Sequence, residues 1–170
     1  MNIVLLFPAD FISLKTVSLI GRRLAHVRDV LKPSVNDTVS VGLEGGKIGT
    51  GQVTSLNEHE MVMYVSLTDA TPMKLPVILC LALMRPIVLK RVLQTAVTMG
   101  VEEIIFFHSY RVEKSFWQSS LLAEATLRDL MVLGLEQAKD TILPKISFQK
   151  KFKPFVEAVF PALLKGRKGM

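Results

Sequence analysis

The sequence predicts a mixed α and β protein in two parts, a small β-barrel or sandwich followed by a unit of alternating strands and helices. Up to about residue 72, short apolar and alternating runs are separated by turn residues. Beyond that point, longer apolar runs alternate with helical patterns. The chain of 170 residues is 49% hydrophobic, enough for one sizeable core or two small ones. We therefore expect one unit at 1–72 and a second at 73–170.

The first unit contains five short runs that are typical of β-strands. They are "NIVLLF", "SLKTVSLI", "TVSVGL", "GTGQVTSL" and "MVMYVSL". Turn residues separate them, as at Glu44–Lys47 and Asn57–His59. The segment "GGKIGTG" has a lysine among glycines, but Ile48 follows Lys47 where a phosphate-binding loop requires Ser or Thr. We therefore expect a hairpin there.

One helix is expected within the first unit, in "RRLAHVRDVLK". Leu24, Val27, Val30 and Leu31 have the spacing of an apolar stripe, and Pro33 ends the pattern. The other side chains of the segment must lie mostly off the buried stripe, where they form a basic outer surface. They are Arg22, Arg23, His26, Arg28 and Lys32.

After a linker at 69–76, the second unit begins with "VILCLAL", a continuous apolar run typical of a parallel strand buried on both faces. Pro86 then opens a helix that Gly100 caps. The residues of this helix that we expect to face inward are Val88, Val92, Thr95, Ala96 and Met99.

A second buried strand, "EEIIFFH", precedes a long helix at 124–139. We expect Glu136 and Gln137 to lie on the solvent-exposed face of this helix. "ILPKISF" begins another extended piece, and "KPFVEAVFPALL" predicts a short helix. The chain ends in the basic tail "KGRKGM".

Charge favours an anionic partner. Twenty-one Lys and Arg outnumber fifteen Asp and Glu, for a formal charge of +6. Arg85 follows the first strand of the second unit, and Arg111 and Lys114 follow the second, so both cationic loops should meet at the carboxyl edge of the sheet. Cations along the next helix, Lys90 and Arg91, extend this charge, and Tyr110, Phe116 and Trp117 supply aromatic rings for an unstacked base. The alternative is a solvated face whose aromatic rings belong to the core.

Other patterns exclude several classes of protein. The start of the chain lacks the basic region of a signal peptide, and no apolar run approaches the roughly 18 residues of a membrane span. We therefore expect a cytoplasmic protein. Cys80 lies in an apolar run, where a buried, inert thiol is expected. The three histidines lack the spacing of metal ligands, and His108 is expected to hydrogen-bond to backbone at a strand end.

Three segments together resemble the RsmE family of bacterial 16S ribosomal RNA uracil-N3 methyltransferases. These are the His26 to Asp37 helix and strand entry, the "MGVEEI" step, and "EQAKDTILPKI". The resemblance implies an N-terminal PUA-like RNA-binding barrel and a knotted SPOUT domain. It also implies a homodimer that uses S-adenosylmethionine to methylate N3 of a uridine in the small ribosomal subunit.

The sequence departs from the family pattern at several points. Met84-Arg85-Pro86 stands where the family commonly has Lys-Gly-Asp, Thr98 and Met99 replace Glu-Leu before Gly100, and Lys139 stands where arginine is usual. The chain ends at Met170, before the family's Gly-Pro-Glu-Gly-Gly loop. We therefore expect only the N-terminal part of the SPOUT domain, without a cofactor site.

The resulting functional expectation is RNA binding by this chain and methylation by the longer family enzyme. A non-catalytic RNA-binding module and an oligomerising piece without ligand remain alternatives. No proton acceptor can be assigned, and Arg85 and Arg111 are the candidates for electrostatic support of the base or its phosphate. The residues that we expect to contact RNA are Arg22, Arg23, His26, Arg28, Lys32, Arg85, Lys90, Arg91, Tyr110, Arg111 and Lys114.

Overall fold

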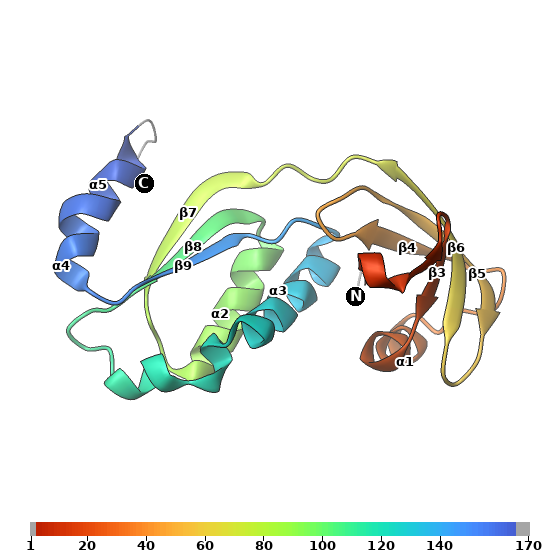
Figure 1. The fold of residues 1–170 in the computed structure, drawn as a ribbon, viewed down its shortest axis with the longest axis horizontal. Coiled ribbons are helices and arrows are strands. Elements are labelled where there is room, and N and C mark those ends of the chain that lie inside the picture. Colours follow the sequence, from red (N-terminus) through yellow and green to blue (C-terminus); the bar gives the residue numbers. More distant parts are fainter. Residues whose placement is uncertain (1–2, 166–170) are drawn as a thin grey trace.

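The structure, a computed structural model, describes residues 3–165. A curled six-stranded sheet and a three-stranded parallel sheet lie side by side along the long axis of the molecule, joined by an extended segment (Figure 1). This arrangement confirms the mixed α and β class. Of the basic tail, residues 166–170 lie outside the described part of the chain.

The six-stranded sheet has the order β1-β4-β5-β6-β3-β2. Its strands are β1 (Val4–Leu6), β2 (Phe11–Ser13), β3 (Thr16–Leu19), β4 (Thr38–Leu43), β5 (Ile48–Leu56) and β6 (Met61–Asp69), with η1 (Pro8–Asp10) and α1 (Gly21–Val30) between them. β1 pairs with β4 in parallel, and the other neighbours are antiparallel. In the described chain β1 and β2 are the edges of this sheet.

The glycine-containing segment between β4 and β5 forms the predicted hairpin. Gly45 turns the chain with a φ of +69°, a conformation that glycine adopts without strain. At Gly49 a Cβ atom would lie 1.8 Å from the Ser66 carbonyl oxygen, so this position of β5 requires glycine.

Helix α1 covers the core of the first sheet with only two side chains. Leu24 and Val27 are buried among strand residues that include Val41 and Met63. The prediction was wrong for Val30, which is 48% exposed, and for Leu31, which is 37% exposed. Val30 is the last residue of the helix and Leu31 its C-cap, and Lys32 adopts a φ of 48°, so both side chains lie where the chain turns away from the helix axis.

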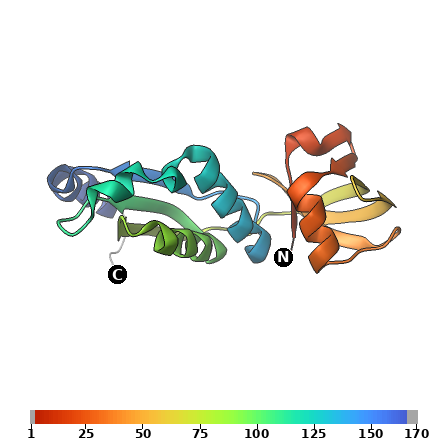
Figure 2. The same cartoon turned by 90° about the horizontal axis from the view of Figure 1, so that it is seen from below.

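The second unit has the parallel strand order β7-β8-β9. Its elements are β7 (Leu75–Ala82), α2 (Pro86–Thr98), β8 (Val101–Phe107), η2 (Lys114–Gln118), η3 (Ser120–Leu122), α3 (Glu124–Ala138), β9 (Lys145–Gln149), α4 (Phe152–Pro154), the π-turn η4 (Phe155–Val159) and α5 (Phe160–Leu164). Helices α2 and α3 lie together on one face of the sheet (Figure 2).

Two predictions for this unit were wrong. β7 is an edge strand of the described sheet, and its side chains are partly exposed rather than buried on both faces. On α2 the buried positions are Leu89, Leu93, Ala96 and Val97, whereas Thr95 and Met99 are exposed. The buried face of α2 is therefore rotated by about one residue position relative to the predicted face.

Close packing of α2 on α3 explains the rotation. Gly134 of α3 lies so near Val97 that an added Cβ would come within 2.7 Å of the valine Cβ. Because the two helix backbones approach closely there, the Val97 side of α2 becomes the buried side.

Strand β1 packs on both units. Val4 and Leu6 belong to the core of the six-stranded sheet, whereas Leu5, which points the opposite way, belongs to the core of the second unit. The Ile3 amide donates to the Glu136 carbonyl oxygen of α3 at 3.2 Å. The hairpin also joins the units, since Thr141 Oγ1 donates to the Gly46 carbonyl oxygen at 2.6 Å.

This contact buries Glu136, contrary to the prediction of a solvated face. Glu136 is 1% exposed, and its Oε1 atom has no hydrogen-bond partner among the described residues. Burial raises the pKa of its carboxyl above the ordinary value of 4.5, while the guanidinium groups of Arg22 and Arg23 partly oppose that rise. Gln137, one residue later, is exposed as predicted.

Candidate functional site

The carboxyl ends of the three parallel strands lie together at the end of the molecule farthest from the six-stranded sheet (Figure 1). Ala82 is in register with Phe107, and Phe107 with Gln149, so the following loops start side by side. The Leu83 amide donates to the Phe107 carbonyl oxygen at 2.9 Å, which extends the pairing into the first loop. The strand ends from which the cationic loops start therefore lie at one edge of the sheet, as predicted.

We call this set of exposed side chains the strand-end rim. It comprises Arg85, Tyr110, Arg111, Lys114, Lys150 and Lys151. Within the described chain, none of its cations forms an ion pair. Glu113 is an exposed carboxylate in the same loop as Arg111. The rim thus presents five cations and little opposing charge to solvent.

Lys150 and Lys151 were missed by the sequence analysis. They directly follow β9, and the argument that located Arg85 and Arg111 after their strands applies to them equally. The sequence contains the pattern that could have located them, because the lysines of "FQKKFK" directly follow "ILPKISF", a segment that is predicted to be extended. The third parallel strand adds two cations to a rim that was predicted from two strands.

The aromatic residues near the rim divide into two groups. Tyr110 is fully exposed, so its ring is available to stack on a base. Phe116 and Trp117 pack against the core of the second unit, as the alternative interpretation of these rings predicted.

His108 lies where β8 ends, and Trp117 holds its ring. The His108 amide donates to the Gln149 carbonyl oxygen at 2.9 Å, which continues the pairing of β8 with β9. Trp117 Nε1 donates to His108 Nδ1 at 3.0 Å. The prediction that this strand-end histidine is hydrogen-bonded to backbone is therefore confirmed, and the indole partner of its ring is an additional contact that was not predicted.

Lys90 and Arg91 are exposed on α2, the helix that begins directly after Arg85. They extend the positive charge of the rim along the first turns of the helix. Arg91 also borders a shallow groove beside β7, whose apolar wall includes Leu79 and Val92.

The basic residues of α1 do not form one outer surface. Arg22, Arg28 and Lys32 are exposed, and His26 is partly buried. Arg23, predicted to be on the outer surface, instead lies inside the unit.

Arg23 is held by four contacts. Its guanidinium donates to both carboxylate oxygens of Asp10 at 2.6 Å and to the Leu5 carbonyl oxygen at 3.0 Å, and it lies 4.5 Å from the centre of the Phe7 ring. The side chains of this pair are only 14% and 9% exposed. A carboxylate as buried as Asp10 needs such a partner, which explains the inward position of Arg23.

The rim and the exposed face of α1 lie toward opposite ends of the molecule, on either side of the contact between the units (Figures 1 and 2). The two sets of candidate residues are therefore separate surfaces. One ligand must be extended to contact both.

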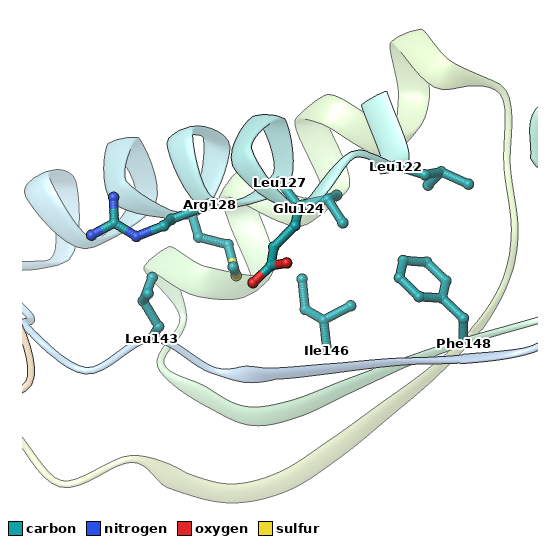
Figure 3. A pocket seen from close by; sticks show the side chains of 8 residues that line it. Leu122, Glu124, Leu127, Arg128, Leu143, Ile146 and Phe148 are labelled. Atoms are coloured by element: carbon teal, nitrogen blue, oxygen red, sulfur yellow. The ribbon is translucent and has the colours of Figure 1, made fainter. Parts of the chain in front are cut away.

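A cleft of about 530 Å³ lies between α3 and β9 (Figure 3). It is lined by Leu122, Glu124, Leu127, Arg128, Met131, Leu143, Ile146 and Phe148. The Glu124 carboxylate points toward the strand, whereas the Arg128 guanidinium points away and pairs with Glu44 at 2.7 Å. The other residues that line the cleft are apolar.

Across residues 3–165 there is no group of three or more His, Cys, Asp or Glu that could hold a metal ion. Within the same range no helix is long and apolar enough to cross a membrane. Cys80 is partly buried, and the pKa of its thiol is raised by burial and by the negative charge of Glu103, so little reactive thiolate forms there.

A comparison with protein families gives the class to which this fold belongs. The model of the RNA methyltransferase domain family matches residues 71–164, more than half of the chain. The chain belongs to this family, and the resemblance to RsmE proteins is confirmed.

Two curated relatives are called ribosomal RNA small subunit methyltransferase E. The protein from Treponema pallidum is 27% identical over 157 residues, which cover 91% of this chain and 59% of the relative. That from Borreliella burgdorferi is 27% identical over 154 residues, covering 90% of this chain and 63% of the relative. This chain therefore spans less than two thirds of the length of either relative.

Solved structures show the same fold. A ribosomal RNA small subunit methyltransferase E from Neisseria gonorrhoeae, bound to S-adenosyl methionine, has a TM-score of 0.63 at 21% identity and covers 86% of this chain and 63% of its own. A putative methyltransferase from Legionella pneumophila, in complex with S-adenosyl methionine, has a TM-score of 0.68 at 14% identity. The match covers 93% of this chain and 67% of the Legionella chain.

Proposed function

We propose that this chain is the RNA-binding portion of a ribosomal RNA methyltransferase whose target is N3 of a uridine in 16S RNA of the small ribosomal subunit. The observation that carries the proposal is the strand-end rim, in a chain of the RNA methyltransferase domain family. Five exposed cations without ion pairs suit a phosphate backbone, and the exposed Tyr110 ring suits an unstacked base. Arg85 and Arg111 support the base or its phosphate electrostatically.

Two domains carry this function. Residues 1–72 form a PUA-like RNA-binding barrel, and residues 73–170 form the N-terminal part of a SPOUT domain. The curled six-stranded sheet and the parallel sheet support this division. The exposed Arg22 and Arg28 of α1, together with Lys32 just after the helix, provide the phosphate contacts of the first domain.

The cofactor of the whole enzyme is S-adenosylmethionine, which supplies the methyl group. We expect no complete site for it among the described residues. The three loops after the described strands contain no glycine, so they lack the close backbone approach that a nucleoside requires. Each loop also carries a cation, which suits phosphate better than a sulfonium. We therefore expect this chain to bind RNA without binding the cofactor by itself.

Calorimetric titration with S-adenosylmethionine, beside equilibrium binding of labelled 16S RNA fragments at several salt concentrations, tests the proposal. We expect salt-dependent RNA binding and no detectable heat from the cofactor. Micromolar cofactor binding would mean that the site lies within this chain after all. Absence of RNA binding would refute the proposal.

A non-catalytic RNA-binding module is the second candidate, and the lack of a glycine loop at the rim favours it. Transfer of labelled methyl groups to small ribosomal subunits separates the two, with a longer protein of the family as the positive control. The enzyme of the first candidate acts as a homodimer in the cytoplasm, and sedimentation velocity of the chain tests whether these residues suffice for dimer formation.

A further inference from the structure

We propose that His108 is a hydrogen-bond donor to RNA, in its neutral form and through Nε2–H, toward an oxygen acceptor of the strand bound at the rim. The inference rests on the proposed RNA binding and adds an uncharged, directional contact to it. It comes from the hydrogen bond between Trp117 and His108.

The bond with Trp117 selects one tautomer of the imidazole. An indole nitrogen can only donate, so His108 Nδ1 must accept at the observed 3.0 Å. A nitrogen that accepts carries no proton, and the proton of the neutral ring is therefore on Nε2. Among residues 3–165, no second hydrogen bond engages this ring. The ring thus has one fixed donor that remains free.

A series of aromatic contacts connects the core to Trp117 and so fixes the position of the His108 ring. Phe106 is fully buried, and Phe148 stacks on it with centroids 5.7 Å apart. Trp117 contacts Phe148 edge-on at 6.2 Å, and Lys150 Nζ lies 6.0 Å from the Trp117 ring centre. Because the aromatic residues lock the indole, little entropy is lost when His108 meets a ligand.

The position of His108 fits an RNA contact. Its backbone is fixed by the Gln149 carbonyl oxygen at the end of β8, and the side chain is partly exposed. Two residues later, Tyr110 presents its ring to solvent beside Arg111. A base that stacks on Tyr110 brings carbonyl oxygens to this part of the rim, and its phosphates meet the cations. Both kinds of oxygen can accept from Nε2–H.

Nitrogen-detected NMR tests the tautomer directly. The chain has only three histidines, so the ring signals can be assigned by substitution. At a pH of about 8.5, above the usual range of imidazole titration, we expect a protonated Nε2 and an unprotonated Nδ1 for His108. Trp117→Phe should give a mixture of tautomers. A protonated Nδ1 in the unsubstituted protein would overturn the proposal.

RNA binding tests the donor. His108→Asn places an amide near the Nδ1 position and removes the Nε2 donor, whereas His108→Gln keeps an amide nitrogen near Nε2. We expect the His108→Asn variant to bind a single-stranded uridine oligonucleotide roughly two- to tenfold more weakly than the unsubstituted protein. The His108→Gln variant should show a smaller loss of affinity. The salt dependence should not change, because the lost contact is uncharged.

Two further outcomes identify the acceptor and separate this inference from the proposed function. If His108→Asn no longer weakens binding of an oligonucleotide with abasic sites, the acceptor is a base carbonyl. If the substitution still weakens binding, the acceptor belongs to the RNA backbone. RNA binding that is unchanged by Asn, with no shift of the His108 Nε2 signal on titration, refutes the donor role alone. Failure of the unsubstituted protein to bind RNA refutes the proposed function, whatever the tautomer.

Discussion

Replacing Arg23 with alanine should destabilise the protein, although its neighbour Arg22 should tolerate the same change. The substitution leaves the Asp10 carboxylate buried without the two hydrogen bonds of 2.6 Å that now satisfy it. Removing one partner of a buried ion pair costs about 3–5 kcal/mol. The pair is 14% and 9% exposed, so solvent screens little of this cost.

Urea denaturation provides the measurement, with Arg22→Ala as the matched control on the same helix. Arg22 is exposed, and its replacement should change the free energy of unfolding by less than about 0.5 kcal/mol. For a chain of this length, the Arg23 loss corresponds to a fall in Tm of about 6–20 °C. The Asp10→Asn/Arg23→Gln double variant should recover part of it.

The reasoning fails if the two alanine variants are equally stable. It also fails if Arg23→Ala leaves stability intact and reduces the salt dependence of RNA binding, because Arg23 would then contact phosphate. That result would restore the original sequence prediction for this residue.

Three other perturbations have expected outcomes. Replacing Lys150 and Lys151 together with alanine should lower the salt slope of RNA binding by roughly 0.7 for each lost phosphate contact, with an unchanged Tm. Gly134→Ala should destabilise by about 1–3 kcal/mol in denaturant titrations, because its Cβ would meet that of Val97 at 2.7 Å, and an unchanged midpoint would contradict the close helix contact. Because the folded-state pKa of Glu136 is raised, the folded protein holds its proton more tightly, so stability falls as pH rises above about 4.5. Glu136→Gln should remove that part of the pH dependence in urea titrations at pH 5 and pH 8.

Local patterns predicted most of the elements. The hairpin at Gly45 follows from turn chemistry, and β8 and α3 follow from an apolar run and a long helical pattern. These features depend on residues close in sequence. The rim could also be predicted, because the end of each strand is a local property and parallel strands end at one edge.

The errors concern contacts between distant segments. The buried face of α2 depends on Gly134, and the position of Arg23 depends on a carboxylate in η1. Glu136 is buried because β1 docks on α3, which no periodicity within the helix reveals. The indole of Trp117 as a partner of the His108 ring was not predicted either, because nothing in the sequence places the two side chains together.

The placement of β1 has a consequence for how the chain folds. Leu5 fills a core whose other buried members all come from the second unit, among them Leu127 and Leu135. During synthesis, β1 emerges first, yet one side of it remains uncovered until α3 has been made. Formation of this core therefore closes a long loop from β1 to α3, and the second unit expressed alone would lack a side chain that only β1 supplies.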